Sequence, residues 1–220
     1  MKNNIYLFDM NGVIIDDEHL HEQATLGVLE RHGYKAANSD YKRFFAGRTR
    51  DAGFRNYHKA NDADYDIHTL AEEKDALYQE LARHGLQTVD HVIAYIKSLS
   101  DEGHTMAIVT GAPRKEAKHV LETFGLTDHF LQVITGEDVT LSKPHPEGYL
   151  KAAAMLQVNP ADCIVVEDAP MGVQAAHRAG MRVAAVTTTH TATELHEADW
   201  IVQQFTDDHR IQFQASWQAA

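Results

Sequence analysis

Short apolar runs recur along the chain, and helix-like segments separate most of them. The runs contain few polar residues, which is typical of strands buried on both faces of a sheet. They are IYLF (5–8), TMAIV (105–109), LQVI (131–134), CIVV (163–166), RVAAV (182–186) and WIV (200–202). From residue 88 onward strands and helices alternate, so the pattern predicts a doubly wound, Rossmann-like α/β fold with a parallel sheet.

Helices are expected between these strands. Apolar residues spaced three or four positions apart indicate the first two, which end before Gly103 and Gly125: Val89, Ile93, Ile96 and Leu99, then Ala117, Val120, Leu121 and Phe124. Two more are expected at 147–157 and 170–179, the second with Pro170 at its start and Gly180 at its end. Proline and glycine favour these two positions of a helix.

Residues 17–86 interrupt the alternation, because they contain no strand-like run. Within them, the segments 19–33 and 66–85 have helical spacing. Each segment ends in His-Gly, a pair that suits a helix C-terminus. We therefore expect residues 17–86 to form a helical cap domain inserted after the first strand, and residues 1–16 and 87–220 to form the α/β core domain.

Charge and cysteine content narrow the function. The 220 residues carry a formal net charge of −12, which disfavours nucleic acids and anionic membranes as partners, since both need clustered Lys and Arg. The apolar run before Asp9 is too short for a signal peptide or a membrane span. Cys163 is the only cysteine, which excludes an internal disulfide and suits a reducing compartment. We expect a cytoplasmic monomer that binds neither nucleic acid nor membrane.

Polar residues follow three of the expected strands. Asp9 comes directly after the first run, Thr110 after the second, and Glu167 with Asp168 after the fourth. The carboxyl ends of parallel strands meet at one edge of the sheet, where open α/β sheets bind ligands. Lys143 lies in the loop before another expected helix and is predicted to join them.

The residue types at this edge suit phosphate chemistry. Three carboxylates form the hard oxygen site that Mg²⁺ prefers, completed by waters and a phosphate oxygen. Lys143 and Thr110 can hold the remaining phosphate oxygens, and a carboxylate such as Asp9 can attack phosphorus to form an aspartyl-phosphate. Each residue alone is also an ordinary turn former or helix cap, but their joint placement after strands favours a site.

Four segments in order resemble the motifs of the haloacid dehalogenase superfamily, and most of all its β-phosphoglucomutase-like phosphatases and mutases. They are FDMNGVIIDD (8–17), IVTGAP (108–113), SKPHPEGYL (142–150) and VVEDAPMGVQAAHRAG (165–180). The resemblance implies that Asp9 is the nucleophile and that phosphate is bound by Thr110, Gly111 and Lys143. It also implies a Mg²⁺ site formed by the side chains of Asp9, Glu167 and Asp168 and the main-chain carbonyl of Asn11.

The resemblance extends to the expected cap. The segment FFAGRTRDAGF (44–54) is similar to the family's substrate-specificity loop, which implies that the substrate is contacted by Gly47, Arg48, Thr49 and Arg50. The arginine fork suits a distal phosphate or the hydroxyls of a phosphosugar. His21 matches a family histidine near the cap hinge. Without the resemblance, two arginines between helices would be read as a solvated turn.

Asn11 departs from the family pattern, which has Asp at this position. The family's Asp protonates the leaving oxygen and then deprotonates the attacking water or hydroxyl, whereas a carboxamide cannot exchange a proton usefully near neutral pH. Three explanations are open: an experimental replacement that traps a bound ligand, a natural enzyme that is slow or uses good leaving groups, or a natural binder without catalysis.

Taken together, the sequence favours a Mg²⁺-dependent phosphatase acting on a small phosphorylated metabolite, such as a sugar phosphate. A β-phosphoglucomutase-type mutase and a catalytically silent phosphate-ligand binder are the alternatives. A phosphoacceptor receiver domain also gathers acids, a Thr and a Lys at one sheet edge. In that fold the acid pair comes first, however, whereas Thr110 and Lys143 precede Glu167 and Asp168 here.

Overall fold

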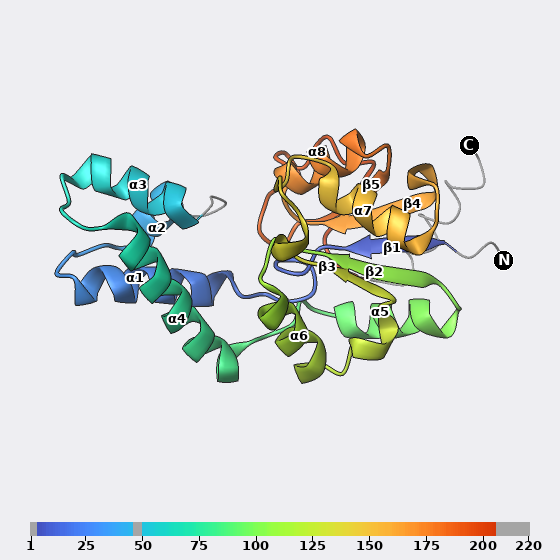
Figure 1. Ribbon diagram of the computed structural model, residues 1–220, viewed down its shortest axis with the longest axis horizontal. Helices are drawn as coiled ribbons and strands as arrows, with labels where there is room; N and C mark the ends of the chain where they lie inside the picture. The colour runs from blue at the N-terminus through green and yellow to red at the C-terminus, as the bar shows by residue number, and fades with distance from the viewer. Residues whose placement is uncertain (1–3, 46–49, 206–220) are drawn as a thin grey trace. The chain divides into compact units, whose positions relative to one another are not determined.

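The computed structural model describes residues 4–45 and 50–205 (Figure 1). The chain divides into two compact units, with boundaries between residues 16 and 17 and between residues 87 and 88. We call residues 17–87 the helical unit, and the chain on either side of it the core unit. Among the described helices, none combines the length and the apolar character needed to cross a bilayer.

The core unit is built on a sheet in which all neighbouring strands are parallel. In the described part of the chain it has six strands, in the order β3-β2-β1-β4-β5-β6. Their bounds are β1 Ile5–Phe8, β2 Thr105–Val109, β3 Gln132–Ile134, β4 Cys163–Glu167, β5 Arg182–Val186 and β6 Trp200–Val202. The strand order reverses between β1 and β4, where Phe8 is in register with Val166. The predicted fold class is confirmed.

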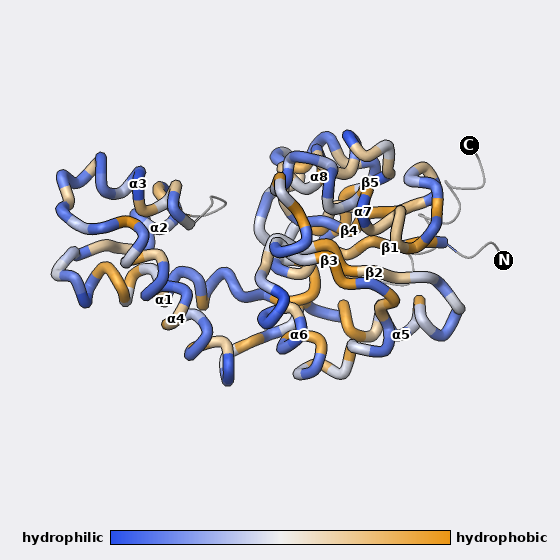
Figure 2. The backbone as a smooth tube through the Cα atoms, in the orientation of Figure 1, coloured by the Kyte–Doolittle hydropathy of each residue, from blue (hydrophilic) through white to orange (hydrophobic). Residues whose placement is uncertain are grey.

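Helices cover both faces of this sheet. Figure 1 shows α5 and α6 on one face and α7 and α8 on the other, which is the doubly wound arrangement that right-handed crossovers produce. The strands between them are strongly hydrophobic (Figure 2). The helices are α5 Val92–Asp101, α6 Arg114–Thr123, α7 Glu147–Leu156 and α8 Pro170–Arg178, with 3₁₀ turns η1 Thr127–His129, η2 Gly136–Asp138 and η3 Pro160–Asp162.

Two expected residues precede the elements that the sequence assigned to them, and a third, Phe124, follows the end of α6. Val89 precedes α5, and its main-chain N–H donates instead to the carbonyl of Ile14 at 3.0 Å. Leu131 precedes β3 and is 68% exposed. Both residues lie where the chain enters an element, and an apolar pattern locates such boundaries poorly because neighbouring loop residues are often apolar too.

The described part of the helical unit consists of helices α1 Glu18–Arg31, α2 Asn38–Phe44, α3 Arg50–Asn61 and α4 Ile67–Gly85. The sequence predicted α1 and α4, but neither α2 nor α3. Both are polar, and aromatic packing supports them: the rings of Phe45 and Phe54 meet edge to face, with centroids 5.2 Å apart. Gly53 leaves room for this contact, because a Cβ there would lie 2.5 Å from Phe45 Cδ1.

The two His-Gly pairs behave differently. Gly33 follows α1 with a φ of +82°, and its N–H donates to the carbonyl of Glu30 at 2.9 Å, so it ends the helix as predicted. Gly85 is the last residue of α4, and a Cβ there would lie 3.1 Å from the side chain of Leu20. The C-cap prediction for Gly85 is therefore wrong, and close packing accounts for the glycine.

Candidate active site

The chain turns tightly just after β1 and carries Asp9 to the end of the neighbouring strand. The N–H of Asp9 donates to the carbonyl of Val166 in β4 at 2.9 Å. The carbonyl of Met10 then accepts from the N–H groups of Ile14 at 2.8 Å and Ile15 at 3.1 Å, which closes the turn. Asn11 lies in this turn, beside the point where the strand order reverses. Ligands of open α/β sheets bind at such reversal points.

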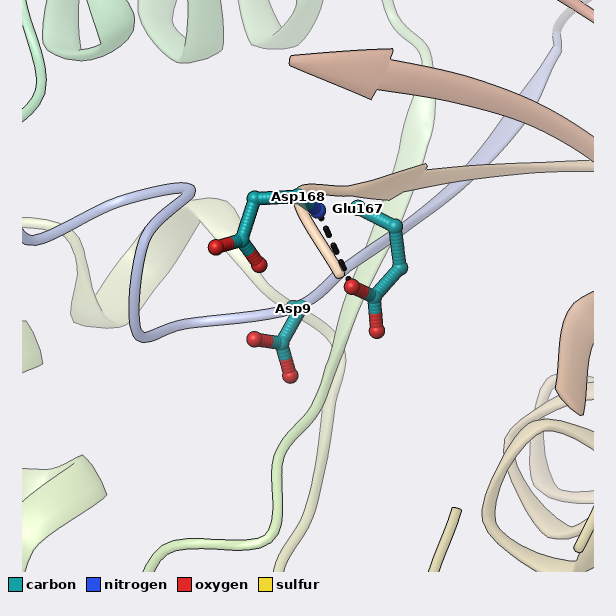
Figure 3. A group of neighbouring side chains, drawn as sticks. All are labelled: Asp9, Glu167 and Asp168. Atoms are coloured by element: carbon teal, nitrogen blue, oxygen red, sulfur yellow. Dashed lines mark hydrogen bonds between the residues drawn. The ribbon is translucent and has the colours of Figure 1, made fainter. Parts of the chain in front are cut away.

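Three carboxylates meet at this edge (Figure 3). One carboxylate oxygen from each of Asp9, Glu167 and Asp168 lies within 4.8 Å of the others. The residues are 8%, 1% and 5% exposed, so water screens their charges poorly. Burying like charges this close together is unfavourable unless a cation balances them.

Lys143 places its ammonium group among these acids. Its Nζ donates to Asp9 Oδ1 and to Glu167 Oε1, each at 2.6 Å, and to the carbonyl of Val109 at 3.1 Å. Glu147 holds the loop before α7, because its carboxylate accepts from the N–H groups of Thr140 and Leu141. The structure therefore brings Lys143 to the acids, as the sequence predicted.

Glu167 is bound by donors on both of its oxygens. Oε1 accepts from Lys143 and from the hydroxyl of Tyr149 at 2.9 Å. Oε2 accepts from the N–H groups of Asp168 at 2.9 Å and Ala169 at 3.1 Å. A Cβ on Gly172 would lie 1.8 Å from Oε1, so only glycine leaves space for this carboxylate over the start of α8.

Asp168 points to a different set of neighbours. The hydroxyl of Thr189 donates to its Oδ2, and His190 Nδ1 lies 3.0 Å from its main-chain oxygen. Gly12 has a φ of +74°, and a Cβ there would lie 2.0 Å from Asp168 Oδ2. The turn after β1 thus fits against Asp168 only because residue 12 is glycine.

Burial and the neighbouring charges shift the pKa values of these groups, upward for Asp9, Asp168 and Lys143 and downward for Glu167. Burial raises the pKa of Asp9 to about 7, with Glu167 adding to the shift and Lys143 opposing it. Burial and the charges of Glu167 and Asp9 raise the pKa of Asp168 well above its usual range. Burial also opposes the charge of Glu167, but Lys143 and the N–H donors outweigh it and lower the pKa of Glu167. For Lys143 burial is likewise outweighed, and the two acids raise its pKa.

Comparison with known proteins identifies the family. The model of the haloacid dehalogenase-like hydrolase family matches residues 6–186, which is most of the chain. This chain belongs to the haloacid dehalogenase-like hydrolases. The resemblance predicted from its four motifs is confirmed.

Several curated relatives of this hydrolase are phosphatases. It is 34% identical over 203 residues to validoxylamine A 7'-phosphate phosphatase of Streptomyces hygroscopicus subsp. limoneus. The match covers 92% of this chain and 94% of that protein. It is 32% identical over 177 residues to a fructose-1-phosphate phosphatase of Escherichia coli, covering 80% of this chain and 92% of the relative. A β-phosphoglucomutase structure from Clostridium difficile shares the fold, with a TM-score of 0.80 and 21% identity over 99% of this chain and all of that one.

The remaining predicted residues of the hydrolase core have simpler surroundings. Thr110 is 4% exposed at the end of β2, where its hydroxyl accepts from the N–H of Ala112 at 3.0 Å. Gly111 follows it on the exposed side of the same turn. Both residues lie just beyond Val109, whose carbonyl binds Lys143.

The residues predicted to select the substrate belong to the helical unit. His21 lies on α1, where its ring stacks on Tyr78 with centroids 4.1 Å apart. Gly47, Arg48 and Thr49 fall outside the described residues, and Arg50 is the first residue of α3.

Sequence reasoning missed four residues of the hydrolase site: Gly12, Tyr149, Gly172 and Thr189. Three of them lie within the motif segments already quoted, so position could have drawn attention to them. Only coordinates show why a side chain is excluded at each glycine. Thr189 follows β5, and its place after a strand was the available signal.

The acidic donors fit a hard divalent cation. Carboxylate oxygens from several residues, such as those of Asp9, Glu167 and Asp168, are ligands that Mg²⁺ takes in proteins. A bound cation would also relieve the repulsion that burial creates between Asp9 and Asp168. The donor set of this hydrolase is therefore compatible with Mg²⁺.

Proposed function

We propose that this hydrolase is a Mg²⁺-dependent phosphatase that acts on a small phosphate monoester, such as a sugar phosphate. The observation that carries the proposal is the meeting of Asp9, Glu167 and Asp168 at the reversal point of the sheet, with Lys143 paired to Asp9 and Glu167. The names of the two phosphatase relatives support a phosphorylated sugar or sugar-like substrate. Asp9, Asp168, Glu167 and the carbonyl of Asn11 would hold the cation, which supplies positive charge beside the phosphoryl oxygens.

In this proposal Asp9 is the nucleophile. One of its carboxylate oxygens bonds to phosphorus as the ester P–O bond breaks, and the released alkoxide takes up a proton. Water then attacks the phosphorus of the aspartyl-phosphate, which releases inorganic phosphate and restores Asp9. Lys143 stabilises the negative charge of the phosphoryl oxygens, assisted by Thr110 and the main chain of Gly111.

Asn11 stands where proton transfer would be needed. Its carboxamide can donate a hydrogen bond to the leaving oxygen but cannot supply or accept a proton. Turnover is then slow for alkyl leaving groups, which need protonation, and faster for acidic ones. This residue also favours a second candidate function, a protein that binds a phosphate ligand without hydrolysing it.

Residues 17–87 are proposed to act as a cap that selects the substrate. The support is the resemblance of the segment around Arg48 and Arg50 to a specificity loop, together with the compactness of this unit. His21 is included by its match to a family histidine. This part of the proposal concerns substrate choice and leaves the chemistry to the core unit.

The test is phosphate release from a panel of phosphosugars and p-nitrophenyl phosphate, with Mg²⁺ and with EDTA. We expect slow release that requires Mg²⁺, and none from Asp9→Asn. Product analysis separates hydrolysis from transfer to a sugar hydroxyl, which would indicate a mutase. Tight Mg²⁺-dependent binding of a phosphosugar without release of phosphate from any ester would favour the binder.

A further inference from the structure

We infer that Tyr149 is a positioning residue that fixes Glu167 and Lys143 for phosphate binding. The inference rests on the proposed function, because it assigns Lys143 to the phosphoryl group. Tyr149 lies in the first turn of α7 and is 1% exposed. Its hydroxyl donates to Glu167 Oε1 at 2.9 Å, and Lys143 Nζ lies 5.1 Å from the centroid of its ring.

Lys143 needs such support because its side chain is long and flexible. An ammonium group has three protons to donate, and the structure gives Lys143 three acceptors: Asp9, Glu167 and the carbonyl of Val109. The face of the Tyr149 ring attracts the same cation. The ring and the acceptors together hold Nζ beside the proposed nucleophile.

Binding a phosphoryl group requires Lys143 to redirect at least one of these hydrogen bonds. If the bond to Glu167 is the one released, Oε1 keeps the hydroxyl of Tyr149 as its partner. A buried carboxylate oxygen without a donor is unfavourable, and Glu167 is 1% exposed. Tyr149 therefore lets Lys143 turn toward phosphate while Glu167 stays in place.

The hydroxyl is the feature that distinguishes this role from simple packing. Tyr149 belongs to a hydrophobic cluster that also contains the small buried residues Ala152 and Ala153 of α7. A phenylalanine would fill that space equally well. A phenol is needed only because Glu167 lies within hydrogen-bonding reach.

The experiment compares Tyr149→Phe with Tyr95→Phe, a matched loss of a hydroxyl from a buried tyrosine on α5. The affinity for inorganic phosphate is measured by calorimetry in the presence of Mg²⁺, so the test does not depend on turnover. We expect Tyr149→Phe to bind phosphate about 10-fold more weakly, the range that one hydrogen bond to a charged group supplies. Tyr95→Phe should bind as the parent does, and thermal unfolding reports any general loss of stability.

A double variant tests the route through Glu167. If Tyr149 acts through that carboxylate, Tyr149→Phe should lower phosphate affinity much less in a protein that already carries Glu167→Gln than it does in the parent. Unchanged phosphate affinity in Tyr149→Phe, or additive effects in the double variant, would overturn the inference. So would a parent protein that binds no phosphate. Phosphate binding without release from any ester would instead reject the phosphatase proposal and leave the role of Tyr149 standing.

Discussion

Asp9 and Asp17 are both buried acids close together in the sequence, yet their surroundings differ. Asp9, in the core unit, shares its site with Glu167 and Asp168. Lys143 forms ion pairs with Asp9 and Glu167. Asp17, at the start of the helical unit, is 3% exposed and accepts from the hydroxyl of Tyr78 at 2.5 Å. Asp9 therefore lies next to other carboxylates, whereas Asp17 lies next to hydrogen-bond donors.

The donors around Asp17 continue beyond Tyr78. His21 Nε2 lies 3.3 Å from the carboxylate, and its Nδ1 lies 2.9 Å from Lys74 Nζ. Because an ammonium group only donates, Nδ1 must accept, which leaves Nε2 to carry the proton toward Asp17. The polar groups of this cluster match one another, as in a structural network.

The comparison shows which kind of burial marks a reactive site. Matched donors and acceptors stabilise a fold, whereas an excess of buried like charge destabilises it and is retained where a ligand compensates. The core unit should therefore gain stability when Asp168 is neutralised, whereas the helical unit should lose stability when Asp17 is neutralised. Substitutions test this contrast directly.

The largest effect is expected from adding an acid to the core site. Asn11→Asp should raise turnover about 10²- to 10⁴-fold, the range that proton transfer supplies. Aryl phosphates should gain least in the first chemical step, because their leaving groups need little protonation. Steady-state rates and burst kinetics measure both steps.

The parent protein serves as the control in that experiment, since it should release one equivalent of phenol quickly and then slow. Mg²⁺ affinity should change little, because residue 11 is proposed to contribute its main-chain carbonyl. If Asn11→Asp is no faster than the parent on any substrate of a broad panel, residue 11 is not the missing acid/base. The protein is then better explained as a binder.

Neutralising an acid of the same site should separate stability from function. Asp168→Asn should weaken Mg²⁺ binding about 10²-fold or more, measured by calorimetry. Without metal at pH 8, Asp168→Asn should also unfold at a higher temperature than the parent. The direction of this stability difference follows from the raised pKa of Asp168. The proton on Asp168 stabilises the folded parent at low pH and is lost as the pH rises through the folded-state pKa.

The stability advantage of Asp168→Asn over the parent should therefore shrink as the pH falls. The matched variant is Asp17→Asn, which removes an acid from the balanced cluster. It should lower stability by about 1–3 kcal/mol and leave Mg²⁺ affinity unchanged. A metal-free Asp168→Asn protein less stable than the parent at pH 8 would contradict the contrast between the two clusters.

The sequence predicted which groups would lie together in the core unit, because buried parallel strands have a distinct apolar pattern. Residues at the carboxyl ends of such strands meet at one edge of the sheet, which brought Asp9, Glu167 and Asp168 together in the prediction, and Lys143 was added from the loop before the next helix. The pattern carries no information about which oxygen meets which donor. The hydrogen bonds of Tyr149 with Glu167 and of Thr189 with Asp168 are therefore apparent only in the structure.

The helical unit was predicted less completely. Helices α2 and α3 are polar, and contacts such as that of Phe45 with Phe54 stabilise them, which no local periodicity reveals. The pairing of Asp17 with Tyr78 joins α4 to the residue before α1 and is equally invisible in the sequence. Long-range packing, rather than intrinsic helix propensity, stabilises these parts of the helical unit.

The smallest effect is expected from the arginines of the helical unit. Arg48→Ala and Arg50→Ala should each raise KM for phosphosugars about 10-fold, as loss of one hydrogen bond to a charged group implies. Neither should alter kcat/KM for p-nitrophenyl phosphate, which lacks the sugar. The measurement is best made in the Asn11→Asp background, where turnover is expected to be high enough to resolve KM.

Arg55→Ala is the matched control, because Arg55 is an exposed arginine on α3. It should leave both substrates unaffected. If Arg48→Ala and Arg50→Ala reduced kcat/KM in equal proportion on phosphosugars and on p-nitrophenyl phosphate, the arginines would support the fold or the phosphoryl group itself. Substrate selection would then be a property of the core unit, and the proposal that the acids carry out the chemistry while the arginines select the substrate would be wrong.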